Sequence, residues 1–293
     1  MNSNLTERIK KTQHTFSKGQ RLIASYIMES YEQMAFVTAL KLGKTVGVSE
    51  STVVRFATVL GYSGYPELQE AMQEMIKNRL TSVQRLQIVD KTTQYEDLLD
   101  RSIQQDLDVI ESTKEEISRD EFYKAVEAIT NCDTIYVIGT GSSYALATFL
   151  SHYLNLIFDR VVMLNAMGEA QTLGQMINLK ENDAVIGISF PRYSKKVIKA
   201  LKYSADKGAC VVAITDNTMS PIALDATYVL TAKSETVSFV DSLVGPLSLI
   251  NALIVTIAIK RKGKVIKNLQ TLEEIWDEYR IYEKIEDDFG EEK

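Results

Sequence analysis

The stretch that decides the fold of the larger part of this chain is TIYVIGTGSSYALATFLSHYLNLIFDRVVML, residues 134–164. It begins with a short β-branched run at 134–139 that ends in glycines and serines, and an apolar segment of helix length follows at 142–158. A second short apolar run comes at 161–164. Strands that are apolar throughout and alternate with helices are typical of a parallel sheet covered on both faces.

The same alternation continues on both sides of this stretch. The hydrophobic pattern predicts further strands at 184–189, 210–215 and 226–231, and helices at 120–131, 168–176, 194–208 and 239–261. We therefore predict that residues 120–262 form a three-layer α/β/α domain with a parallel sheet, preceded by an all-helical N-terminal domain. The expected overall class is α plus α/β.

Residues 1–78 have helical periodicity and contain no convincing strand. Thr38 is a suitable N-cap for a short helix at 39–46, and Ser49 is a suitable N-cap for a second helix at 50–60. Two short helices joined by a tight turn predict a helix-turn-helix unit.

Glycines mark the turn and the end of this unit. Gly47 lies between the two helices, and Gly61 follows the second one in the position where a left-handed residue commonly ends a helix. The second helix is expected to bury Val53, Val54, Phe56 and Leu60.

The start of the second helix carries the residue types that DNA contacts require. Short polar side chains let a helix end enter the major groove, hydroxyls and backbone N–H groups bind phosphate, and arginine reads guanine or phosphate. The DNA-binding candidates are Ser49, Glu50, Ser51, Thr52 and Arg55. The alternative is a helical hairpin whose second helix is merely capped.

Charge and composition narrow the possible classes. The chain of 293 residues has a net charge of −6, but residues 1–80 carry +3 and the remainder −9, as expected when a nucleic-acid-binding module precedes an acidic body. Two cysteines cannot form a disulfide scaffold or a multi-cysteine zinc site, and two histidines argue against His-based metal chemistry. The sequence shows no secretory signal and no apolar run long enough to span a membrane, so we expect a cytoplasmic protein. We also expect that it uses no cofactor and no metal.

Two segments lie outside the predicted domains. Residues 79–119 read as a helical linker, and residues 263–293 as a charged helical tail that contains Trp276. The linker carries an apolar stripe suited to packing on the next domain or on a second subunit, formed by Leu98, Leu99, Ile103, Leu107 and Ile110.

Two loops at predicted strand ends are candidates for a ligand site. Gly139–Ser143 and Ser189–Ser194 each offer hydroxyls at the start of a helix, an arrangement that suits an anionic group such as phosphate. Tight turns also use glycine and serine for structural reasons alone. A dinucleotide fits poorly because GTGSSY lacks the third glycine of the dinucleotide-binding pattern.

The motif GVSESTVVRFATVLGYSGYPEL at 47–68 resembles the N-terminal helix-turn-helix of RpiR-type transcriptional regulators. IYVIGTGSS, AVIGIS and CVVAITDNTMSPIA resemble the SIS (sugar isomerase) domain that follows it in that family. The resemblance covers the chain up to about residue 262. It implies a regulator that binds operator DNA as a homodimer or homotetramer and senses a phosphorylated sugar.

The resemblance also implies ligand-binding residues. Gly141, Ser142 and Ser143 match the first phosphate-binding loop, and Ser189 and Ser194 match the first and last hydroxyls of the family's S-x-S-G-x-T loop. Here Phe190-Pro191-Arg192-Tyr193 replaces x-S-G-x, and Arg192 can substitute as a phosphate ligand. Glu235 lies near the position of an acidic group in SIS isomerases.

Two alternatives to a sugar-phosphate-controlled regulator stay open. One is a SIS-type sugar-phosphate isomerase or lyase, which needs a base to move a proton between carbons. The other is a regulator whose SIS domain binds no ligand and only dimerises, a reading that the altered Phe190–Tyr193 loop permits.

Overall fold

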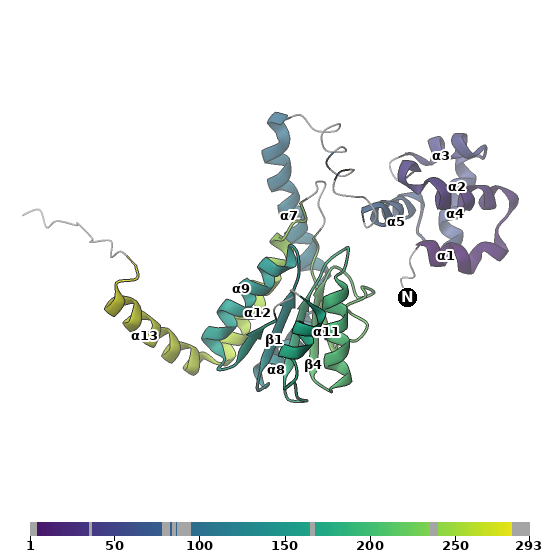
Figure 1. Cartoon of the computed structure of the whole chain (residues 1–293). Helices are drawn as coiled ribbons and strands as arrows, with labels where there is room; N and C mark the ends of the chain where they lie inside the picture. Colours follow the sequence, from purple (N-terminus) through teal and green to yellow (C-terminus); the bar gives the residue numbers. More distant parts are fainter. Residues whose placement is uncertain are drawn as a thin grey trace, which may run out of the picture. The chain divides into compact units, whose positions relative to one another are not determined.

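A computed structural model of the chain describes residues 5–34, 37–77, 83, 86, 95–164, 168–234 and 240–282 (Figure 1). The described residues fall into two compact units, one before residue 94 and one after it. The domain boundaries expected from the sequence stay predictions.

The first unit is all helical. Its helices are α1 (Leu5–Thr12), α2 (Lys18–Met34), α3 (Ala39–Val46), α4 (Glu50–Val59) and α5 (Tyr65–Lys77), with a 3-10 turn at Gln13–Thr15. They enclose one apolar core in which the rings of Phe16 and Phe56 pack edge to face, 5.3 Å apart. The core also holds Ile23, Ile27, Leu42, Val53, Leu68 and Met72.

The second unit is built on a parallel sheet of five strands in the order β2-β1-β3-β4-β5. The strands are β1 (Ile135–Gly139), β2 (Val161–Met163), β3 (Ala184–Ile188), β4 (Cys210–Thr215) and β5 (Tyr228–Thr231). Every residue of β1 and β3 is buried, which explains why these runs are apolar throughout rather than alternating.

Helices cover both faces of this sheet (Figure 1). The helices of the unit are α7 (Leu98–Glu116), α8 (Arg119–Thr130), α9 (Ser143–Ile157), α10 (Glu169–Gln175), α11 (Lys195–Asp206), α12 (Val244–Lys260) and α13 (Lys262–Tyr279), with a 3-10 turn at Tyr95–Asp97. Apolar residues of α8, α9 and α12 pack on one face, and those of α11 pack on the other together with Met176 and Leu179. The predicted fold class, helical domain plus three-layer α/β/α domain, is confirmed.

The helix predicted at 239–261 is shorter than expected. It begins at Val244, and residues 235–239 lie outside the described part of the chain. Pro246 explains the later start, because proline lacks an N–H and is tolerated only in the first turn of a helix.

The predicted stripe on α7 does not pack on the second unit. Helix α7 contacts α12 through a different face, on which Val109 and Thr113 are buried. The stripe residues are 37% to 69% exposed: Leu98, Leu99, Ile103, Leu107 and Ile110. The alternative, that the stripe packs on a second subunit, stays a prediction.

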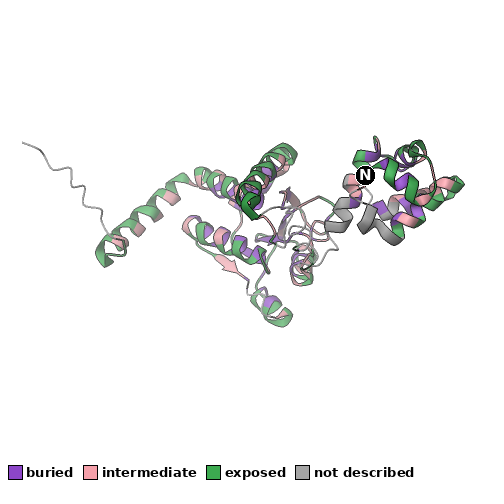
Figure 2. Cartoon of the chain, turned by 90° about the horizontal axis from the view of Figure 1, so that it is seen from above, coloured by how far each residue is buried: buried purple, intermediate pink, exposed green. Residues whose placement is uncertain are grey.

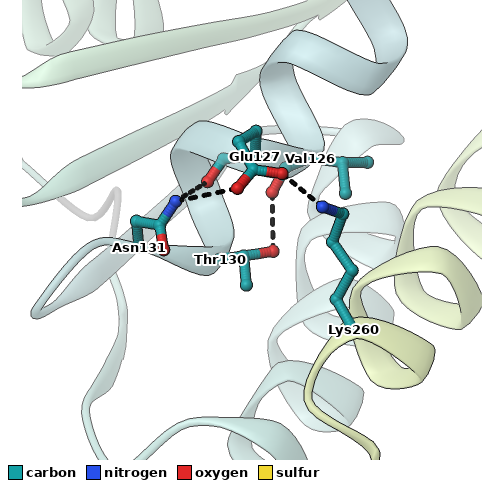
Figure 3. A network of polar contacts seen from close by, with 5 residues as sticks. All are labelled: Val126, Glu127, Thr130, Asn131 and Lys260. Carbon is teal, nitrogen blue, oxygen red and sulfur yellow. Dashed lines mark hydrogen bonds and ion pairs between the residues drawn. The ribbon is translucent and has the colours of Figure 1, made fainter.

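A polar network joins the ends of α8 and α12 on the outside of the unit (Figure 3). Lys260 donates to Glu127 Oε2, and Asn131 Nδ2 donates to Glu127 Oε1 (3.2 Å) and to the Glu127 carbonyl (3.0 Å). These hydrogen bonds, first that from Lys260, lower the pKa of the Glu127 carboxyl. The network therefore fixes the end of α8 against α12 near the point where α13 begins.

Among the described residues, no single helix is both long and apolar enough to cross a membrane. Helices α12 and α13 meet those criteria only when counted together, across a bend of 101°.

We predict that Gly245→Ala destabilises the second unit. A Cβ at Gly245 would lie 2.5 Å from the Lys233 carbonyl oxygen and 2.8 Å from Thr113 Oγ1, so α12 would have to shift. The expected loss of unfolding free energy is about 1–3 kcal/mol, measurable by urea denaturation.

Gly263→Ala is the matched control, because a Cβ there meets nothing within 4 Å. It should leave stability unchanged or raise it by up to about 1 kcal/mol. Equal stability of the two variants would contradict the close packing at Gly245.

Candidate functional site

The first candidate site is the turn between α3 and α4. Thr38 Oγ1 accepts a hydrogen bond from Lys41 N and Ser49 Oγ accepts one from Thr52 N, each at 3.3 Å, so both residues are N-caps as predicted. Gly47 has φ 77° and ends α3 in the left-handed conformation. The local sequence therefore determines where α3 ends and where α4 begins.

The two helices approach each other closely at Gly43. A Cβ at this position would lie 2.8 Å from the carbonyl oxygen of Val48, so a larger residue would push α3 away from the turn. Helix α4 is held by Val53 and Phe56, which are fully buried. The prediction that Val54 is also buried is wrong: it is 40% exposed, because the next residue along a helix lies about 100° around the axis from Val53.

The N-terminus of α4 presents hydroxyl groups to solvent. Ser49 Oγ lies 2.9 Å from Ser51 Oγ and 2.8 Å from Thr52 Oγ1. Arg55 is exposed one turn after Ser51 and so shares its face. Glu50 is exposed as well. This face offers backbone N–H groups, hydroxyls and a guanidinium, the donors that phosphate and base edges accept.

The second candidate site lies at the point of the sheet where the order of the strands reverses. From β1 the chain passes to β2 on one side, and then returns to β3 on the other side of β1. Ligands of such sheets bind in the crevice outside the carboxyl ends of the two strands at this switch point. The two loops chosen from the sequence follow β1 and β3, so the fold places both at the carboxyl ends of these neighbouring strands.

The loop after β1 is shaped by two glycines. A Cβ at Gly139 would lie 2.4 Å from the carbonyl oxygen of Ser143, and Gly141 has φ 60°. Ser143 is the first residue of α9 and is buried. Ser142, just before it, is exposed, and its Oγ donates to Asp241 Oδ2 at 3.5 Å.

The loop after β3 is closed by its own serines. Ser189 Oγ accepts a hydrogen bond from Ser194 N at 3.1 Å, and Phe190 is buried. Arg192 has φ 73°, a conformation that is unfavourable for a residue with a side chain. Arg192 stands where the motif S-x-S-G-x-T has glycine, the residue that adopts this left-handed conformation most easily.

A second polar network stabilises this loop. Tyr193 OH donates to the carboxylate of Asp216 at 2.8 Å and 3.0 Å. The same carboxylate accepts from Thr215 Oγ1 (3.0 Å) and from Asn217 Nδ2 (2.7 Å). Because Asp216 directly follows β4, this network ties the loop to the next strand of the sheet.

Asp241 connects the two loops. Its Oδ2 lies 3.9 Å from Arg192 Nη2 and accepts the hydrogen bond from Ser142. Arg192 and Asp241 have side chains that are 49% and 23% exposed, so the ion pair is open to solvent. Ser142 and Arg192, predicted separately from two loops, are thereby brought together around one carboxylate.

The remaining predicted residues have different surroundings. Ser189 acts inside its loop, and Ser194 is the N-cap residue of α11 without a side-chain capping hydrogen bond. Glu235 lies outside the described residues. Sequence reasoning missed Asp241, Tyr193 and Asp216 as members of the site. Only Asp216 carried a signal, since it directly follows a predicted strand.

The described part of the chain contains no group of three or more His, Cys, Asp or Glu side chains that could hold a metal ion. Burial raises the pKa of the Cys132 thiol to about 12 and also raises that of Cys210. Neither cysteine lies at the two loops.

The sequence matches known families over both units. Residues 3–79 match the helix-turn-helix domain of the rpiR family, and residues 128–256 match the SIS domain. The solved sugar isomerase domain of an RpiR transcription factor from Sphaerobacter thermophilus is 31% identical, with a TM-score of 0.58, and covers 61% of this chain and 99% of its own. The chain belongs to the RpiR family of transcriptional regulators.

Other relatives of this RpiR regulator match most of its length. An uncharacterised HTH-type transcriptional regulator of Caldanaerobacter subterraneus is 25% identical in an alignment 277 residues long that covers 91% of this chain and 95% of the relative. The Vibrio vulnificus NanR protein, solved in complex with ManNAc-6P, is 24% identical with a TM-score of 0.58. That alignment covers 94% of this chain and 99% of NanR, and shows that the two share a fold.

We predict that Arg192→Gly gives a more stable protein than Arg192→Ala. Both variants lose the guanidinium, but only glycine adopts φ 73° without strain. The difference in unfolding free energy should be about 1 kcal/mol in favour of glycine, measured by thermal or urea denaturation. At Lys196, which lies in the first turn of α11, the same pair of substitutions should favour alanine. A more stable alanine variant at position 192 would contradict the left-handed conformation.

Proposed function

We propose that this RpiR regulator binds operator DNA through the N-terminus of α4, with residues 1–78 as its DNA-binding domain. The support is the exposed face formed by the hydroxyls of Ser49 and Ser51 and the guanidinium of Arg55, at the end of a helix where the dipole favours anions. Since its target is DNA, we place its action in the cytoplasm.

We propose that two or more copies act together. One helix-turn-helix offers too little surface for tight specific binding, whereas two can occupy the halves of a repeated or palindromic site. A homodimer or homotetramer therefore fits the proposed function.

We predict that Thr52→Ala combined with Arg55→Ala weakens operator binding. Loss of a base contact costs about 1–3 kcal/mol at one operator position, whereas loss of a phosphate contact weakens binding to all sequences and lowers the salt slope by about one. Fluorescence anisotropy against operator and unrelated DNA at several salt concentrations separates these outcomes.

The matched control for this experiment is Arg119→Ala. Arg119 is an exposed arginine in the first turn of α8, in the second unit, and its loss should leave DNA affinity unchanged. Wild-type operator affinity in the double variant would exclude α4 as the DNA-reading helix.

We further propose that residues 120–262 sense a phosphorylated sugar. The single observation that carries this is the convergence of two hydroxyl-bearing loops on the switch point between β1 and β3, with the N-termini of α9 and α11 directly behind them. Backbone N–H groups, serine hydroxyls and Arg192 are all donors suited to a phosphate. NanR, a relative with the same fold, was solved with ManNAc-6P, which supports a phosphorylated sugar as the class of ligand.

We propose that the domain binds this sugar without converting it. Isomerisation requires a base that moves a proton between adjacent carbons. Of the carboxylates described at the crevice, Asp216 accepts hydrogen bonds from three side chains and Asp241 bridges Ser142 and Arg192. Both therefore have a structural task. Turnover of a bound sugar phosphate, followed by NMR, would overturn this part of the proposal in favour of an isomerase or lyase.

We predict that Ser142→Ala and Ser194→Ala each weaken sugar-phosphate binding. Each variant should remove one charge-assisted hydrogen bond of about 1.5–3 kcal/mol, or roughly ten- to a hundredfold in affinity. A thermal-shift screen of sugar phosphates first finds the ligand, and isothermal titration then measures both variants. Arg192→Ala should lower the affinity for the phosphorylated sugar much more than the affinity for the same sugar without its phosphate.

The matched control is Ser102→Ala, which changes an exposed serine on α7 and should retain wild-type affinity. Wild-type affinity in both loop variants would place the pocket elsewhere. If no sugar phosphate shifts the melting temperature at all, a SIS domain that only dimerises would replace the proposal.

A further inference from the structure

Helix α13 lies beyond the residues that match the SIS domain, and its role is unassigned. It has 18 residues, and none of them is buried (Figure 2). Its first half is attached to the end of α9. Asn268 Nδ2 donates to the Leu156 carbonyl (2.9 Å), and Lys264 pairs with Asp159, two residues after α9 ends. From there the helix leads away from the sheet (Figure 1). Most helical stability in proteins comes from packing of an apolar face, and the second half of α13 leaves Ile275 and Tyr279 exposed.

The apolar residues of α13 follow a heptad pattern. They recur at alternating intervals of four and three residues, at Val265, Leu269, Leu272, Trp276 and Tyr279. Val265 packs on the apolar core of its own unit, so the part of the stripe that is open to a second helix begins at Leu269. Ile266 and Ile275 flank this stripe and are 44% and 43% exposed, and Tyr279 is 67% exposed. Such spacing is typical of a helix that packs lengthwise against another helix.

The charges of α13 are reversed with respect to its dipole. The first half carries Lys262, Lys264 and Lys267, and the second half carries Glu273, Glu274, Asp277 and Glu278. An isolated helix is stabilised by acidic residues at its start and basic residues at its end, so this order is unfavourable for α13 alone. It becomes favourable when a second helix brings its acidic half beside the basic half of the first.

We propose that α13 pairs in antiparallel orientation with α13 of a second copy of this chain. An antiparallel pair opposes Lys262 and Lys267 to four acidic residues at each end, whereas a parallel pair would oppose like charges. The same surface serves both copies, as a two-fold symmetric interface requires. This pairing is independent of the DNA and sugar-phosphate sites.

The heptad stripe determines the alignment of the pair. Leu272 is the middle residue of the stripe and lies at the two-fold axis, next to its own counterpart. Leu269 of one helix then lies opposite Ile275 and Trp276 of the other. Two copies of Leu269 are separated by about 9 Å along the axis, beyond the reach of a disulfide.

Disulfide cross-linking of the full chain tests this alignment. Leu272→Cys should form a covalent dimer roughly tenfold faster or more than Gln270→Cys on the solvent side, because pairing raises the effective thiol concentration. Leu269→Cys and Ile275→Cys should each fail to cross-link alone and should cross-link when mixed. Wild-type chain is the background control, since burial raises the pKa of both native thiols.

Charge reversal provides a second measurement with a built-in rescue. One variant, Lys262→Glu with Lys267→Glu, makes both halves of α13 acidic, and another, Glu273→Lys with Glu274→Lys and Glu278→Lys, makes both halves basic. Each alone should lose Leu272→Cys cross-linking by roughly tenfold or more, and an equimolar mixture of the two should restore it.

Self-linking of Leu269→Cys would show a parallel pair and overturn the proposal. Equal rates for Leu272→Cys and Gln270→Cys would show that α13 does not pair with itself. Circular dichroism of each variant verifies that the chain is folded. Because no step uses DNA or sugar, failure here leaves the proposed function standing, and failure of the proposed function leaves this result unaffected.

Discussion

The pairing of β1 with β3 is the constraint on which the second unit depends. These two strands are aligned from Ile135 beside Ala184 to Gly139 beside Ile188, so they end level with each other. Because side chains alternate between the faces of a strand, a shift by one residue would move the residues that pack on α9 and α12 to the side of α11. The alignment that buries both faces therefore also brings the two loops to the same edge of the sheet.

Local sequence predicted most of the secondary structure because the relevant interactions are local. Thr38 and Ser49 cap helices a few residues away, and Gly47 adopts the backbone conformation that glycine favours. The strands were recognisable because complete burial requires continuous apolar runs. The misplaced start of α12 has a local cause as well, since Pro246 belongs to the first turn of the helix.

The candidate site could be predicted only in part, because its members meet across long stretches of chain. Ser142 and Asp241 are separated by 99 residues, and Tyr193 and Asp216 by 23. No periodicity in a single sequence reports such contacts. The two loops were found because glycine and serine at strand ends have local meaning. Asp241, which joins them, has none, since isolated acidic residues in loops are common on any surface.

The loop after β3 holds a left-handed backbone conformation at a residue that is not glycine. Arg192 takes a left-handed φ, which costs a non-glycine residue about 1–2 kcal/mol, and two contacts hold it there: Ser189 Oγ accepts from Ser194 N, and Tyr193 is bonded to Asp216. The surrounding structure thus determines the backbone path even without glycine. The difference from the S-x-S-G-x-T motif lies in the hydrogen-bond donors that the loop offers. Proline removes a backbone N–H and arginine adds a guanidinium, so the donors at this loop shift from the main chain to a charged side chain with longer reach.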